Sequence, residues 1–106
     1  MPKYLFRAQL AAEGVAGVLK EGGTARRQVV KEAIEKLGGT LEVFYFAFGD
    51  DDVVLIADMP DNQVAAGFAM ETSSSARLSV STTVLLTPED VDAAKEKKSG
   101  WRAPGA

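Results

Sequence analysis

The chain has 106 residues, a net charge of −3 at pH 7 and a hydrophobic content of 46%. This length and composition predict one ordinary globular domain and exclude a disordered chain. The acidic balance argues against a protein that coats nucleic acid, because such proteins are normally basic.

Cysteine and histidine are both missing from the sequence. Their absence excludes disulfides, thiolate nucleophiles, iron–sulfur clusters, Ser-His-Asp triads and histidine-ligated haem or zinc. We therefore expect no cofactor and no metal site. A chain without cysteine fits a reducing compartment, so the expected location is cytoplasmic. No signal peptide is recognisable and no apolar stretch reaches the roughly 20 residues that cross a bilayer, so no membrane partner is expected.

The first third of the chain predicts a strand followed by two helical segments. Residues 4–10 alternate between apolar and mixed positions with a period of two, which is typical of a strand. Residues 14–20 form one or two helical turns that end at Gly22-Gly23. The clearest helix covers residues 24–37, with Thr24 as its N-cap.

The middle of the chain predicts a hairpin. Residues 40–48 form a strand, Gly49–Asp52 form the turn, and residues 53–59 form the next strand. Both strands are largely apolar on both faces, so both faces should be covered. Simple alternation along the first of them puts one set of side chains on one face (Leu41, Val43, Tyr45 and Ala47) and the other set opposite (Glu42, Phe44, Phe46 and Phe48).

The last third predicts a helix, a strand and a further helix. Pro60-Asp61 starts a helix with Asp61 as its cap, and residues 77–87 form a strand. The run Thr87-Pro88-Glu89-Asp90 is a strong start signal for a last helix. Trp101 stands in the tail that follows, where terminal segments are usually loose.

This order of elements predicts an α+β, ferredoxin-like domain of the βαββαβ type. Its antiparallel four-stranded sheet should have the strand order 4-1-3-2, with the main helices on one face and an extra C-terminal helix. We expect a single domain over residues 1–99 and a C-terminal tail over residues 100–106. The open face would expose large side chains of the second and third strands, which predicts sheet-to-sheet packing into a homodimer or a higher oligomer.

The first and fourth strands should place polar side chains side by side on the open face. We predict a ligand-binding patch for a small anion or carboxylate there, because a guanidinium among hydroxyls suits such a group. Its predicted members are Arg7, Gln9, Ser79, Ser81 and Thr83, and Tyr45 of the second strand is predicted as a further ligand-binding residue. Two alternatives remain open: the patch is a hydrated interface rim, or Arg7 pairs with an acid such as Glu42 across the dimer.

Several segments resemble the GYD-domain family, and they occur in the same order over nearly the whole chain. They are Met1–Leu5, Gly22–Arg27, Gly38–Glu42, Phe46–Gly49, Asp52–Val54, Met59–Asn62 and Thr82–Glu89. The resemblance implies a bacterial protein of the dimeric α/β-barrel superfamily and carries no particular activity.

The family signature is a Gly, a Tyr and an Asp near the hairpin. Gly49 and Asp52 match it, whereas Asp51 stands at the Tyr position. Any chemistry of that Tyr in relatives would be missing here. The simpler interpretation is that Gly49 permits the turn and Asp52 hydrogen-bonds turn backbone.

Other clusters have simple explanations. Asp50–Asp52 indicate a solvated turn rather than a cation site, because three adjacent side chains cannot all point at one ion. Arg26-Arg27 indicate a solvated helix face more than an anion site. The aromatic run Phe44–Phe48 is not expected to bind RNA, because the chain is acidic and the strand lies at the sheet edge.

Three functions are compatible with these features. The first is a homo-oligomer that binds a small molecule between sheet and helices without catalysis. The second is a cofactor-free oxygenase- or isomerase-like enzyme, which would need Tyr45, Asp52 or Arg7 in a dry cleft. The third is a purely structural or interaction protein, which would be favoured by a sheet lined wholly with packed apolar residues and no void.

Overall fold

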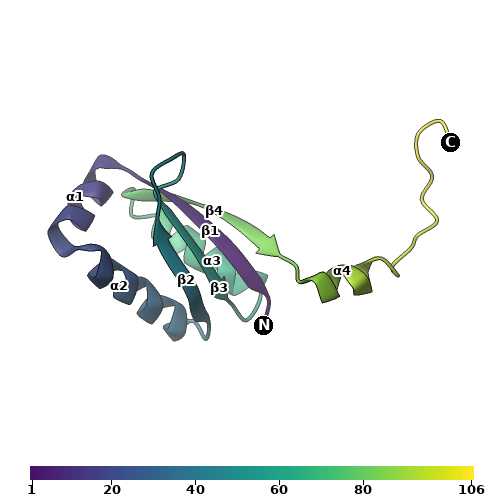
Figure 1. The fold of residues 1–106 in the computed structure, drawn as a ribbon, viewed down its shortest axis with the longest axis horizontal. Coiled ribbons are helices and arrows are strands. Elements are labelled where there is room, and N and C mark those ends of the chain that lie inside the picture. Colours follow the sequence, from purple (N-terminus) through teal and green to yellow (C-terminus); the bar gives the residue numbers. More distant parts are fainter.

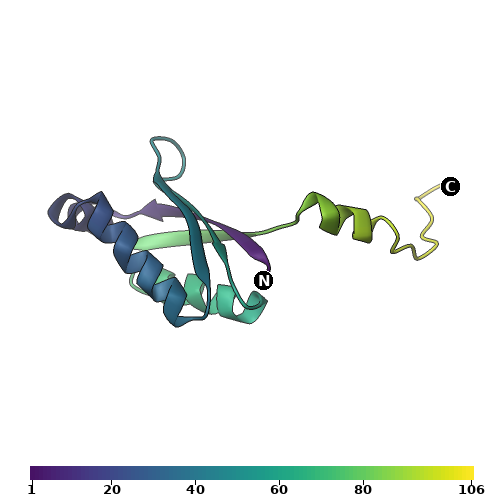
Figure 2. The same ribbon diagram turned by 60° about the horizontal axis from the view of Figure 1, so that its bottom comes forward.

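The structure is a computed structural model that describes residues 1–106. Its elements are β1 (Lys3–Leu10), α1 (Ala12–Glu21), α2 (Gly23–Lys36), β2 (Thr40–Phe46), β3 (Val53–Asp58), α3 (Asn62–Ser73), β4 (Leu78–Leu85) and α4 (Pro88–Ala94). The four strands form one antiparallel sheet in the order β2-β3-β1-β4, which confirms the predicted topology. Helices α2 and α3 lie on one face of this sheet, and the other face is open (Figures 1 and 2).

The core lies between the sheet and the two main helices. Tyr4 and Phe6 of β1 are buried there, and the Phe6 ring meets Phe68 of α3 edge-on at 5.3 Å. The Tyr4 hydroxyl donates a hydrogen bond to Asn62, so its burial leaves no unpaired polar group. Nine apolar side chains make up this core: Tyr4, Phe6, Ile34, Val53, Leu55, Ala57, Met59, Ala65 and Phe68.

A β-bulge in β2 corrects the predicted faces of that strand. Leu41 pairs with Ala57 while Val43 pairs with Ile56, so the register shifts between them. Leu41 and Phe44 consequently both pack against the core. Unbroken alternation is therefore the wrong prediction, because the extra residue of a bulge reverses which face the following side chains occupy. The strand also ends at Phe46 rather than at Phe48.

The two N-terminal helices differ from prediction at their ends. Helix α1 has ten residues instead of one or two turns. Thr24 is not an N-cap, because α2 begins at Gly23 and Gly22 occupies the capping position. Gly22 has φ 89°, a left-handed conformation that favours glycine and lets the chain turn sharply between the two helices.

The caps of the later helices are confirmed. The Asp61 carboxylate accepts a hydrogen bond of 2.9 Å from the amide of Val64 at the start of α3. Thr87 and Asp90 form a capping box at the start of α4. Both signals lie within four consecutive residues, so local sequence alone specifies them.

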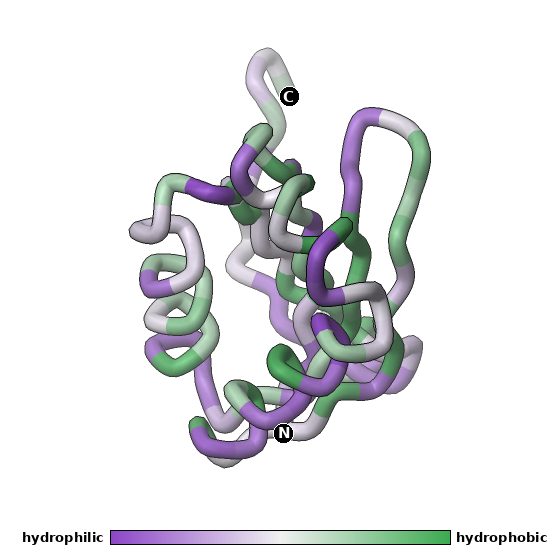
Figure 3. The backbone as a smooth tube through the Cα atoms, turned by 90° about the vertical axis from the view of Figure 1, so that its left-hand side faces the viewer, coloured by the Kyte–Doolittle hydropathy of each residue, from purple (hydrophilic) through white to green (hydrophobic).

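The end of the chain stands apart from the rest. Helix α4 and the residues after it project from the end of β4, away from the sheet and its helices (Figures 1 and 2). Figure 3, which looks onto the α1 end, shows hydrophobic and hydrophilic residues interleaved along the helical turns. No helix combines the length and apolar character needed to cross a bilayer.

Candidate functional site

The sheet register brings the predicted polar residues onto the open face. Arg7 lies opposite Ser81 and Gln9 lies opposite Ser79, and Thr83 pairs with Leu5 on the same face. Tyr45 lies in the same row as Arg7, two strands away, with Val54 between them. Neighbouring strands are about 4.8 Å apart, so Tyr45 and Arg7 start roughly 10 Å from each other. Their role in ligand binding stays a prediction.

These open-face side chains are exposed and partly paired with the hairpin loop. Gln9 donates a hydrogen bond of 2.9 Å to the carbonyl of Asp50. The Arg7 guanidinium lies 3.9 Å from Asp51, which occupies the position of the family tyrosine. Glu42 does not contact Arg7 within this chain, because it pairs with Lys3 instead.

Lys3 forms a charged triad with Glu42 and Asp58 on the open face. Its ammonium lies 2.8 Å from Glu42 and 3.1 Å from Asp58. The hydrogen bond to Glu42, followed by that to Asp58, raises the pKa of Lys3 above its ordinary value of 10.5. A raised pKa in the folded state means that the stabilisation is complete below about pH 10.5 and is lost as pH rises through the folded pKa.

We expect the stabilisation from this triad to be small and to decrease only in the alkaline range, above about pH 10.5. The free energy of unfolding of Lys3→Met should fall below that of the wild type at neutral pH, and the gap should narrow above pH 10.5. Urea denaturation of both proteins across that range measures the gap. A difference that stays constant up to the strongly alkaline end would contradict the assignment.

Asp52 ties the hairpin loop to the end of β1. Its carboxylate accepts a hydrogen bond of 2.7 Å from the amide of Leu10, and its own amide donates to the carbonyl of Ala8 at 2.8 Å. Asp52 thus hydrogen-bonds backbone, as the simpler interpretation predicts. The backbone that it binds is that of β1 and not that of the turn. Gly49 does not need to be glycine for the turn, because its φ is not positive and an added Cβ would meet open space.

Asp52→Ala is expected to lower the free energy of unfolding by roughly 1–3 kcal/mol, because the partly buried Leu10 amide loses a charged acceptor. Asp52→Asn should lower the free energy of unfolding less, because the amide keeps a side-chain oxygen that can accept the hydrogen bond from Leu10. Urea denaturation of the three proteins measures both differences. Equal stability of Asp52→Ala and the wild type would show that this bond does not hold the loop.

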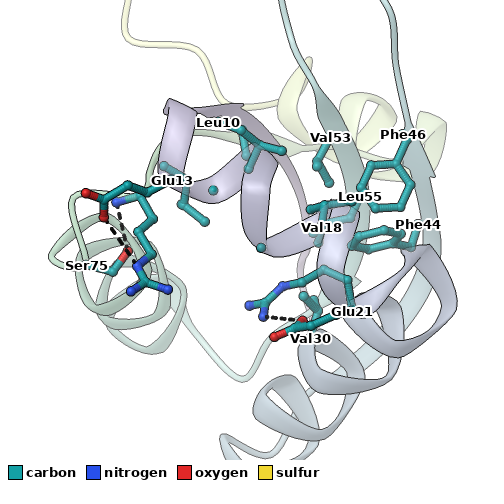
Figure 4. A pocket seen from close by; sticks show the side chains of 16 residues that line it. Leu10, Glu13, Val18, Glu21, Val30, Phe44, Phe46, Val53, Leu55 and Ser75 are labelled. Carbon is teal, nitrogen blue, oxygen red and sulfur yellow. Dashed lines mark hydrogen bonds and ion pairs between the residues drawn. The ribbon is translucent and has the colours of Figure 1, made fainter.

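An apolar pocket of about 360 Å³ lies on the other face, between α1, α2 and the sheet (Figure 4). The phenyl rings of Phe44 and Phe46 stand edge to face in its wall, with centroids 5.4 Å apart. None of the six predicted binding residues lines it. Its apolar wall is formed by Ala8, Leu10, Val18, Val30, Phe44, Phe46, Val53, Leu55 and Leu78.

The pocket lies beside α1, where that helix carries Gly17 instead of a larger side chain. Gly14 and Gly17 both line the pocket, but they differ: an added Cβ on Gly17 would touch nothing within 4 Å, whereas one on Gly14 would meet the carbonyl oxygen of Arg77, so Gly14 lets α1 approach the chain before β4. Helix α1 buries no residue at all. It is held in place where the amide of Ala11 donates a 2.8 Å hydrogen bond to the carbonyl of Arg77, just before β4.

Two ion pairs border the apolar part of the pocket. Arg26 lies 3.6 Å from Glu21, and Arg77 lies 3.8 Å from Glu13. Both distances exceed the roughly 2.7–2.9 Å of a charge-assisted hydrogen bond, so the guanidinium donors are not saturated by these partners. In Figure 4, Glu13 and Glu21 flank the group of apolar side chains.

Sequence reasoning missed this pocket and its charged residues. The sequence predicts a solvated helix face for Arg26, yet its side chain is only 35% exposed and lines the pocket. The available signal was Gly17, a glycine inside a helical segment, where a position without a side chain can leave space against the neighbouring element.

Comparison with known proteins supports the fold and identifies the family. The chain is similar in fold to the crystal structure of MtbAldR, with a TM-score of 0.61 over 81% of this chain at 15% sequence identity. The match covers 52% of the MtbAldR chain, so this chain spans about half the length of that protein. Among curated proteins, none matches the chain. The sequence model of the GYD domain matches residues 4–94, and the chain therefore belongs to the GYD domain family.

Proposed function

We propose that this protein is a homo-oligomer that binds a small molecule in the pocket between α1, α2 and the sheet, without catalysing a reaction. The observation that carries this proposal is the pocket itself, which has a volume of about 360 Å³ and a mainly apolar wall. Ligand pockets of roughly 300–1,000 Å³ that combine an apolar wall with a few polar groups are typical of small-molecule sites.

The proposed ligand has an apolar body and an anionic group. The body would contact Phe44 and Phe46, whose rings stand edge to face in the wall. The anionic group would bind Arg26 and Arg77, because a guanidinium offers two parallel donors to a carboxylate. A carboxylate is the same class of group that we expected from the sequence, now assigned to the opposite face of the sheet.

The distribution of polar groups supports binding rather than catalysis. The side chains of Glu13 and Arg77 are 81% and 63% exposed, so they lie at the opening rather than among the apolar residues. The residues that a cofactor-free enzyme would need are elsewhere: Tyr45 is 67% exposed, and Asp52 holds the backbone of β1. The pocket favours ligand binding over a purely structural module, for which we would expect a fully packed sheet.

The open sheet face supports self-association. Ile56 pairs with Leu5 on one side and with Val43 on the other, and Val54 lies in the next row, so these apolar side chains are contiguous. All four are only partly covered within the chain. A contiguous apolar patch of this kind is typical of an interface, and a second copy offers the matching surface.

Native mass spectrometry of gently purified protein tests both parts of the proposal. We expect a dimer or higher oligomer that carries a discrete small mass. Titration with anilinonaphthalene sulfonate, an apolar probe with an anionic group, tests the pocket directly through its fluorescence increase. A monomer would contradict self-association, and a protein without either co-purified mass or saturable probe binding would contradict the ligand site.

A further inference from the structure

The C-terminal arm, residues 86–106, contains helix α4 but does not pack against the rest of its own chain. Every residue of the arm is exposed. The arm gives the molecule a longest dimension of 58 Å and a radius of gyration of 17.0 Å, whereas a compact chain of this length has about 13 Å. Figures 1 and 2 both show it directed away from the domain.

The N-terminal part of the arm, helix α4, carries strong helix-start signals. Thr87 and Asp90 exchange two hydrogen bonds of 3.0 Å in the capping box, and Pro88 occupies the first turn. A seven-residue helix is nevertheless unstable alone in water. Leu86 and Val91 occupy the positions of a hydrophobic staple but remain 64% and 53% exposed. The helix therefore lacks the surface that would stabilise it.

Trp101 adds a second apolar anchor to the arm. It is the single tryptophan of the protein, and it is 77% exposed. Tryptophan is enriched among the residues that dominate interface energies, because its large ring gains most from being desolvated. An unshielded tryptophan beside an unsupported helix indicates a surface that another molecule covers.

Charge indicates that this other molecule is a second copy. The end of the arm, residues 95–106, contains four basic residues and one acidic residue, and the three acidic residues of the arm before it lie in residues 86–94. Residues 1–85 contain eight basic and eleven acidic residues. The acidic residues of the domain are densest in the hairpin loop at Asp50–Asp52. The basic end of the arm and the acidic loop are therefore electrostatically complementary.

Within one chain the arm and the acidic loop lie at opposite ends of β1, so the arm reaches the loop of a second copy more easily than its own. The arm leaves the sheet where Leu85 pairs with Lys3, at one end of β1. The acidic loop lies at the opposite end, where Asp52 bonds Leu10. A two-fold axis that packs the open faces together with antiparallel strand directions brings the arm of one copy to the loop of the other.

We infer that the C-terminal arm of each chain docks on a second copy of this chain, with Trp101 desolvated at the contact and Lys95–Arg102 beside the partner's acidic loop. This inference rests on the self-association proposed above. Each copy both gives and receives an arm, so the contact is closed and does not propagate into fibres.

Intrinsic fluorescence tests the burial of Trp101 without a label. Because the protein has one tryptophan, its emission reports the arm alone. We expect the emission maximum to move to shorter wavelength as protein concentration rises through the association range, and quenching by acrylamide to weaken in parallel. A fully solvated emission in samples whose measured mass is that of an oligomer would overturn the inference while leaving self-association intact.

Cysteine cross-linking tests where the arm docks, because the chain has no cysteine of its own. Mixed Asp50→Cys and Lys98→Cys chains should form a disulfide-linked heterodimer under mild oxidation. A Glu71→Cys chain, substituted on exposed α3, is the matched control and should cross-link at least tenfold less with Lys98→Cys. Equal yields in both mixtures would overturn docking at the acidic loop. A monomeric mass for the full chain would overturn the inference and the proposed self-association together.

Discussion

Gly17→Leu is expected to weaken binding of anilinonaphthalene sulfonate at least tenfold without destabilising the protein. Gly17 lines the pocket and an added Cβ there would meet nothing within 4 Å, so we expect the larger side chain to take up space that the ligand would fill. Glycine inside a helix costs about 1 kcal/mol relative to a good helix former, so the variant should be at least as stable as the wild type. Fluorescence titration and urea denaturation measure the two effects.

Gly67→Leu is the matched control for this experiment. Gly67 also lies within a helix and would also accept a side chain without contact, but it does not line the pocket. It should bind the probe as the wild type does. Because the open sheet face also offers apolar surface to the probe, equal affinity of both variants and the wild type would place the probe outside the pocket and contradict the proposed site.

Ile56→Glu is expected to weaken self-association at least a hundredfold. Ile56 lies at the centre of the open face, between Leu5 and Val43, and a carboxylate there would face its own copy across a two-fold interface. Two like charges deprived of water cost several kcal/mol, and about 2.7 kcal/mol already corresponds to a hundredfold change. Light scattering after gel filtration measures the mass over a concentration series.

Val29→Glu is the matched control for that interface. Val29 lies on α2, in the helical layer, and is 46% exposed. An acidic residue there should leave the oligomer mass unchanged, because the helices cover the opposite face of the sheet. Circular dichroism confirms that both variants are folded. If Ile56→Glu retains the mass of the wild type, the open face is not the interface.

Local signals predicted the parts of the fold that depend on nearby residues. Asp61 and Thr87 are confirmed as N-caps because a cap needs only an acceptor within three residues of the amide it serves. Thr24 is wrong as a cap, because Gly22 with its positive φ takes the N-cap position two residues earlier. Helix propensity cannot decide between starting points only two residues apart.

The period of two placed Arg7, Gln9 and the β4 hydroxyls on one face, since regular strands keep their parity. It failed at β2, because the bulge between Leu41 and Val43 is a consequence of pairing with β3 and leaves no mark in the sequence of β2 itself. Tyr45 lies beyond the bulge on the face opposite the core, and its role in ligand binding stays a prediction.

The amino-acid sequence predicted the order of elements, the strand topology and the family correctly. These follow from periodicity, capping and short-range turn chemistry, which act over a few residues. Only the packing of separate elements shows that α1 leaves space against the sheet at Gly17, and that Arg26 and Arg77 both line this space. A pocket is the space that distant segments fail to fill, so its existence depends on how they pack and not on any one of them.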